Sequence, residues 1–119
     1  MPKVFLDTNF LVDLFRFKLL EQFFRLEEEY GKFNLFTFKN VLNELKSLKK
    51  EKFAKIALEW VKSNAKLIEK VGKTDELFLS LPLDKNIIIA TNDKYLRKKL
   101  KERGFKVMYV RGLKRIEVD

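Results

Sequence analysis

Two apolar stretches of this 119-residue chain each lead into a carboxylate with hydrogen-bonding side chains beside it. VFLDTN (residues 4–9) runs into Asp7, and IIIATND (residues 87–93) runs into Asp93. Helix capping is one explanation, because Asp, Thr and Asn side chains accept hydrogen bonds from free helix N–H groups. A divalent metal is the other, because a carboxylate that ends a buried strand is costly to desolvate unless it is paired or bound to a cation.

Two more acids can reach the same place from helices. Asp75 opens a helical stretch, and Glu44 lies three residues after Val41 and four before Leu48. Glu44 is therefore expected on the shoulder of the apolar stripe of its helix rather than opposite it. Four converging acids repel one another and require a counter-charge, which Mg²⁺ or Mn²⁺ supplies while accepting oxygen ligands.

Short β-prone runs alternate with helical patterns along the chain, and these elements have to position the acids. Strands are expected at 3–6, 34–37, 66–68, 86–90, 107–110 and 116–118, the last as an edge strand. Helices are expected at 9–30 (as one or two), 38–49, 51–64, from 75 to 82 at the latest, and at 93–103. This alternation predicts a doubly wound parallel sheet, in which ligands bind beyond the carboxyl ends of the strands.

The ends and faces of these helices also have sequence signals. Gly31 and Gly104 are expected to stop the helices that precede them, because glycine readily adopts the backbone conformation of a helix C-terminus. In the 51–64 helix the apolar residues recur at i, i+3, i+4 spacing. They are Phe53, Ile56, Ala57, Trp60 and Val61.

Composition limits the chemistry. A chain of 119 residues with 46% hydrophobic content is expected to form a single domain, residues 1–119, with its own core. No apolar run approaches the roughly 18–20 residues of a membrane-spanning helix, so no membrane partner is expected. The absence of Cys excludes disulfides and fits a cytoplasmic location. The absence of His excludes catalysis by a His general acid or base, so hydrolysis must depend on carboxylates, Lys, Tyr or a bound ion.

The net charge of +9 points to a polyanionic partner, and RNA or DNA is the usual one. The basic residues form two groups, one between Lys46 and Lys55 and one after Asp93. The second group supplies the candidate phosphate contacts, for which a solvated helix face is the alternative explanation. They are Lys94, Arg97, Lys98, Lys99 and Lys101. Tyr95 in the same segment could stack a base or lie in the core.

The motifs FLDTN, VLNEL, TDELF and IIATNDKYL resemble those of the PIN-domain nucleases, and the resemblance extends over nearly the whole chain. It implies a three-layer α/β/α fold with a central, mostly parallel, flavodoxin-like sheet. Matched by position, the acidic quartet of the family would be Asp7, Glu44, Asp75 and Asp93, binding Mg²⁺ or Mn²⁺ for endoribonuclease chemistry. Asn9 and Thr91 would match the polar positions that orient these carboxylates.

The segment ATNDKYLRKKLKERGFKVMYVRG is especially similar to PIN proteins of the rRNA-processing type. This resemblance implies a metal-dependent endoribonuclease for single-stranded or looped RNA, with a pre-ribosomal particle as its partner. A VapC-type ribonuclease toxin, held by an antitoxin, is the first alternative. A catalytically silent RNA-binding scaffold is the second, although none of the four acids is missing. The family resemblance also allows a homodimer.

Overall fold

The computed structural model describes residues 1–119 and contains one six-stranded sheet. The strand order is β3-β2-β1-β4-β5-β6. The strands are β1 (Lys3–Leu6), β2 (Asn34–Phe38), β3 (Lys66–Ile68), β4 (Ile87–Ala90), β5 (Lys106–Arg111) and β6 (Arg115–Val118). All neighbouring pairs are parallel except β5 and β6, which form an antiparallel pair at one edge. The predicted mostly parallel sheet is confirmed, as is the edge position of the last strand.

Seven helices connect the strands. They are α1 (Thr8–Arg16), α2 (Leu20–Arg25), α3 (Glu27–Tyr30), α4 (Lys39–Ser47), α5 (Lys52–Asn64), α6 (Thr74–Leu79) and α7 (Lys94–Glu102). The region 9–30 therefore contains three helices rather than one or two. Gly31 and Gly104 end their helices as predicted, with φ angles of 90° and 93° that disfavour other residues. None of the helices is both long and apolar enough to cross a bilayer.

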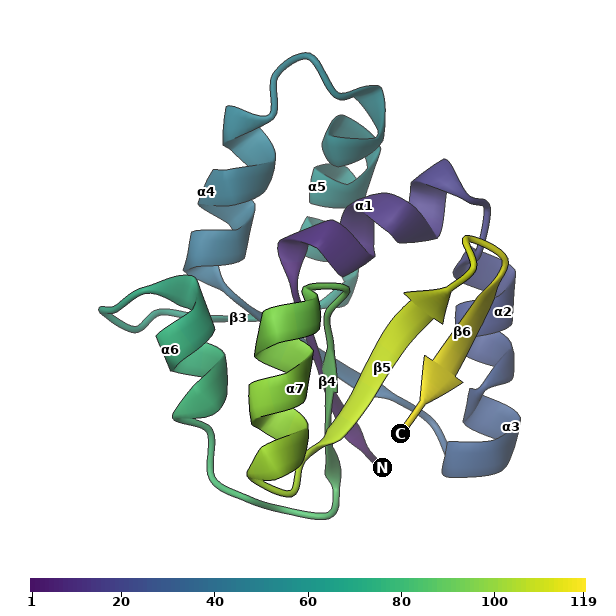
Figure 1. Ribbon diagram of the computed structural model, residues 1–119. Helices are drawn as coiled ribbons and strands as arrows, with labels where there is room; N and C mark the ends of the chain where they lie inside the picture. Colours follow the sequence, from purple (N-terminus) through teal and green to yellow (C-terminus); the bar gives the residue numbers. More distant parts are fainter.

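The helices cover both faces of the sheet, which gives the predicted α/β/α layering (Figure 1). Right-handed crossovers determine which helix lies on which face. The connections from β1 through β2 to β3 place α1 to α5 on one face, and the connections from β3 through β4 to β5 place α6 and α7 on the other. The direction of winding therefore reverses between β1 and β4.

The core contains 31 buried hydrophobic residues in one cluster between these layers. Aromatic pairs contribute to it, including Phe10 and Phe23, whose ring centroids lie 6.1 Å apart. Not every apolar residue of the 51–64 spacing is buried, because Ile56 is 48% exposed. α5 instead buries Ala54, Ala57 and Val61. Small side chains on this face let α5 pack closely against α1.

Candidate active site

The two central strands define the site. β1 and β4 run parallel, with Leu6 opposite Ala90 in their last paired position, and the backbone N–H of Asp7 donates to the carbonyl oxygen of Ala90 at 2.9 Å. The chain therefore leaves both strands at the same edge, at Asp7 and at Thr91. This is also where the winding reverses, and doubly wound sheets open a ligand crevice at such a switch point.

Asp7 is a buried carboxylate, with 6% of its surface exposed. Its Oδ1 accepts a hydrogen bond from the backbone N–H of Thr8 at 2.8 Å, and its Oδ2 accepts one from the hydroxyl of Thr91 at 2.7 Å. Burial raises the pKa of Asp7 from 3.8 to about 6 despite these two bonds, and the charges of Glu44 and Asp75 add to the rise. The fold therefore disfavours the ionised form of the Asp7 carboxyl group.

Glu44 enters the site from α4 and is clamped by two hydroxyls. Thr8 Oγ1, at the start of α1, donates to one carboxylate oxygen at 2.5 Å, and Thr74 Oγ1, at the start of α6, donates to the other at 2.5 Å. The side chain is half-buried, as its predicted position on the shoulder of the apolar stripe implies. Both threonines stand next to predicted acids in the sequence, yet sequence analysis missed their role. That adjacency was the signal that could have found them.

The remaining two acids lie at the rim. Asp93 is the N-cap of α7, with Oδ1 accepting from the backbone N–H of Leu96 at 3.0 Å. Asp75 lies in the first turn of α6, and its pKa is raised by partial burial and then by the charges of Asp93 and Glu44. Capping and cation binding are compatible for Asp93, because each carboxylate oxygen can accept more than one bond.

The two polar positions expected to orient the carboxylates behave differently. Thr91 donates to Asp7 and accepts the backbone N–H of Asp93 at 3.2 Å, so its hydroxyl links two of the acids. Asn9 forms no hydrogen bond with a carboxylate. Its side-chain oxygen accepts the backbone N–H of Asn92 at 3.0 Å and ties α1 to the segment after β4. The side chain of Asn9 therefore positions the backbone of Asn92 and does not orient a carboxylate.

Asn92 is a second residue that sequence analysis missed. Its amide nitrogen donates to Asp13 Oδ2 at 2.8 Å, and its amide oxygen accepts the backbone N–H of Val110 at 2.8 Å. The turn between β4 and α7 is therefore tied to both α1 and β5. These bonds hold the segment that carries Thr91 and Asp93.

The donor set fits a hard divalent cation. All the acids are carboxylates, the neighbouring groups are hydroxyls, and the chain has neither Cys nor His. The charges of Glu44 and Asp75 raise the pKa of Asp7, and the charge of Asp93 raises the pKa of Asp75. The four acids therefore form one electrostatic cluster. No three of them are arranged to hold one ion in this structure. The hydroxyl bonds to Asp7 and Glu44 account for where those two carboxylates point.

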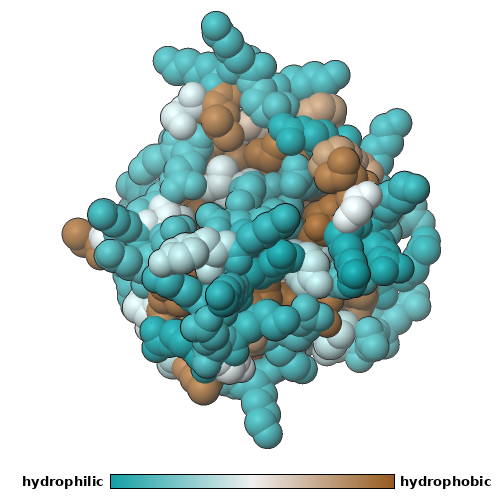
Figure 2. Space-filling view, viewed as in Figure 1, coloured by the Kyte–Doolittle hydropathy of each residue, from teal (hydrophilic) through white to brown (hydrophobic).

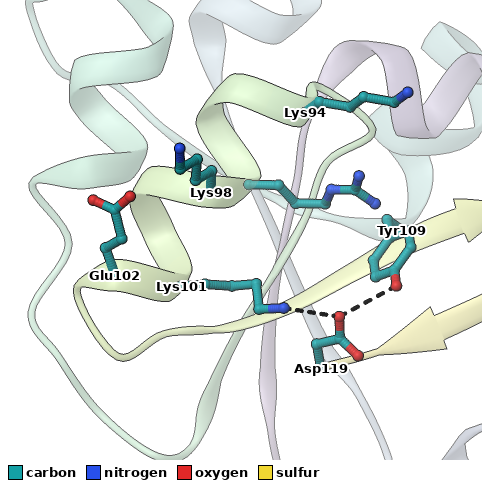
Figure 3. Close-up of a pocket in the computed structure, with 7 residues that line it drawn as sticks. Lys94, Lys98, Lys101, Glu102, Tyr109 and Asp119 are labelled. Atoms are coloured by element: carbon teal, nitrogen blue, oxygen red, sulfur yellow. Dashed lines mark hydrogen bonds and ion pairs between the residues drawn. The ribbon is translucent and has the colours of Figure 1, made fainter.

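Two hollows open on the side of α6 and α7, the largely hydrophilic face in Figure 2. The first, of about 420 Å³, lies between α6 and α7 and includes Glu44 and Asp75 in its wall; we call it the α6–α7 hollow. The second, of about 530 Å³, lies between α7 and β5 and is called the basic hollow (Figure 3). Its basic lining residues are Lys94, Arg97, Lys98 and Lys101.

Four of the five candidate phosphate contacts thus share one hollow. Lys99 is the exception, because it lines the α6–α7 hollow. The basic hollow is also partly neutralised: Lys101 pairs with Asp119 at 3.0 Å, and the Tyr109 hydroxyl donates to the same carboxylate at 3.2 Å (Figure 3). Arg97 stacks over the ring of Tyr109 at 3.9 Å. Lys94 and Lys98 form no ion pair and keep their charges available.

The fold and this acidic switch point define a class of α/β proteins with a carboxylate-lined site. A family profile described as "PIN like domain" matches residues 4–113, and the chain belongs to this family of PIN-domain nucleases. Ribonuclease VapC4 of Methanocaldococcus jannaschii is 33% identical over 128 residues, covering 99% of this chain and 97% of the relative. The family membership predicted from the sequence motifs is therefore confirmed.

Solved structures show the same fold. The PIN domain endonuclease Utp24 superposes with a TM-score of 0.77 at 24% identity, covering 98% of this chain and 90% of that one. The PIN domain of human SMG5 gives a TM-score of 0.59 at 14% identity, with 91% and 93% coverage. VapBC2 from Rickettsia felis, bound to a DNA fragment from its promoter, gives 0.53 at 16% identity, with 92% and 99% coverage.

Proposed function

We propose that this chain is a divalent-metal-dependent endoribonuclease that cuts single-stranded or looped RNA. The observation that carries the proposal is the buried carboxylate of Asp7, whose pKa is raised to about 6 while it faces the charges of Glu44 and Asp75. A catalytic ion would relieve this electrostatic cost. Structural capping alone requires neither the burial nor the clustering.

Asp7, Glu44, Asp75 and Asp93 are the proposed ligands of Mg²⁺ or Mn²⁺. A divalent ion held there would supply Lewis-acid activation of the phosphodiester and of water. The hydroxyls of Thr8 and Thr74 hold Glu44, and the hydroxyl of Thr91 holds Asp7. These bonds restrict the carboxylates to few orientations. Because no three of the acids are arranged to hold one ion, binding an ion would require some of these carboxylates to turn.

The basic hollow is the proposed track for the RNA backbone. It begins at Lys94, the residue directly after Asp93, and follows α7 through Lys98. A helix rises about 1.5 Å per residue, so Lys98 lies about 7.5 Å further along the axis than Asp93. Successive phosphates on one strand could therefore contact the acids and the basic hollow together. The track has no aromatic wall other than Tyr109, which Arg97 covers.

Two biological roles have support. Similarity to Ribonuclease VapC4 over nearly the whole of both chains favours a VapC-type toxin with an antitoxin partner. The motif resemblance of the last third of the chain favours rRNA processing, with a pre-ribosomal particle as partner. Both roles are compatible with a cytoplasmic location. A small antitoxin gene beside the gene for this chain would support the toxin role over rRNA processing.

Substrate access leads to the proposed preference for unpaired RNA. A-form duplex holds its phosphates in a regular geometry, whereas a loop can bend into the crevice between the helices. A hairpin labelled at either the 5′ or the 3′ end and incubated with Mn²⁺ is expected to be cut internally, within its loop. Asp7→Asn protein and an EDTA reaction serve as controls. Cuts confined to the stem, or products that shorten from one end only, would contradict the proposal.

A further inference from the structure

The α6–α7 hollow has an apolar wall that the metal chemistry leaves unexplained. Leu79 of α6 and Tyr95 of α7 supply its exposed apolar surface, and Glu44 and Asp75 line the same hollow. Leu96 also lines it but is only 1% exposed. Its volume of about 420 Å³ lies within the usual range for small-ligand pockets. A group seated in the hollow would lie directly beside the acids.

Tyr95 is the unusual residue of this wall. Its side chain is 66% exposed, so the core gains little from an aromatic residue at this position. The ammonium group of Lys99, one turn further along α7, lies 4.5 Å from the ring centroid. This cation–π contact involves one face of the ring and restrains its position beside the hollow, which both residues line. Because Tyr95 is 66% exposed, the part of the ring that Lys99 does not cover remains open for stacking beside Glu44 and Asp75.

Charge indicates which part of an RNA strand the hollow accepts. Three carboxylates, Glu44, Asp75 and Glu76, face only two lysines, Lys73 and Lys99. The basic hollow has the opposite balance, with four cations against two carboxylates. A phosphate is therefore favoured in the basic hollow. An uncharged planar group is favoured against the apolar wall of the α6–α7 hollow.

We propose that the α6–α7 hollow binds one unpaired nucleobase of the RNA, adjacent to the phosphate that is cut, with Tyr95 as its stacking surface. The inference rests on the proposed function and identifies a residue that determines substrate form. A base held in a duplex cannot enter the hollow without leaving its stack. Tyr95 would thus select unpaired RNA independently of the acids.

The test is a double-mutant cycle between protein and RNA. Abasic nucleotides are placed singly at each loop position of the hairpin, and Kd is measured in EDTA, where no cleavage occurs. Stacking on one aromatic ring corresponds to about a 5- to 150-fold change in affinity per base. In the unaltered protein, one abasic position beside the cut is expected to show a loss of this size. Tyr95→Ala should remove that penalty, and Tyr95→Phe should retain it.

Leu83→Ala is the matched control, because Leu83 is also exposed (64%) but lies before β4 and lines neither hollow. It should leave the abasic penalty unchanged. A penalty that persists in Tyr95→Ala, or that Tyr95→Phe also loses, would overturn the inference. Because binding is measured without metal, this result is separate from cleavage. Failure of the unaltered protein to cut the hairpin with Mn²⁺ would count against the proposed function alone.

Discussion

Replacing Asp7 with Asn is expected to stabilise the metal-free protein at neutral pH while abolishing its RNA cleavage. Burial raises the pKa of Asp7 from 3.8 to about 6. Each pKa unit corresponds to about 1.36 kcal/mol, so the ionised carboxylate costs the fold roughly 3 kcal/mol. Asn removes the charge but keeps only one of the two acceptor oxygens that now bind Thr8 and Thr91. The lost bond offsets about 1 kcal/mol, which leaves a net gain of about 2 kcal/mol.

The pH dependence follows from the direction of the shift. Below pH 3.8 the Asp7 carboxyl is protonated in both the folded and the unfolded chain and costs nothing. Between pH 3.8 and about 6 the folded chain binds more protons than the unfolded chain, so its free energy of unfolding falls as pH rises. Above that window the cost is complete. The stability difference between Asp7→Asn and the unaltered protein should therefore grow from pH 4 to pH 7 and then level off.

Urea unfolding between pH 4 and pH 8 in EDTA measures this difference, with far-UV circular dichroism and the fluorescence of Trp60, the only Trp, as probes. Urea is preferable to guanidinium because it does not screen charges. The comparison has to use the difference between the two proteins, because burial also raises the pKa values of Asp13 and Asp75.

Adding Mg²⁺ or Mn²⁺ at pH 7.5 should reverse the order of stability. The unaltered protein gains stability by linkage as the ion binds the folded state, whereas Asp7→Asn should gain little. Two outcomes would refute the reasoning. One is an Asp7→Asn protein that is less stable in EDTA at pH 7.5, with a difference that does not vary with pH. The other is normal RNA cleavage by a clean preparation of the variant.

Two further predictions concern the support of the acids and the path of the RNA. Thr91→Val should destabilise the protein by about 1–3 kcal/mol in urea unfolding, because it leaves buried partners without their hydroxyl, whereas Thr91→Ser should restore most of the loss. Changing Lys94 and Lys98 to Gln should weaken RNA binding similarly across sequences and flatten the dependence of log K on log salt by about 1.4 on a single strand. The same changes at Lys3 and Lys85, which are exposed at the amino ends of β1 and β4 and so at the opposite end of these strands from the acids, should leave that slope unaltered. An equal effect of both pairs would place the RNA elsewhere.

Much of the fold could be predicted because its signals are local. Apolar runs marked the strands, and Gly31 and Gly104 ended helices through their backbone freedom alone. The positions of Asp7 and Asp93 at one edge followed from parallel strands that each end in a polar segment. These features depend on residues that are close together in the chain, so short segments of sequence are enough to predict them.

By itself, the sequence determined the sheet, the acidic edge and the basic charge of α7. Only the tertiary structure decided which groups hold the acids and which hollow each cation lines. The hydroxyls of Thr8 and Thr74 reach Glu44 across 36 and 30 residues of chain. Lys98 and Lys99, adjacent in sequence, line different hollows. The physical reason is that such contacts depend on how separate helices pack over the sheet, and no local pattern specifies which distant side chains that packing brings together.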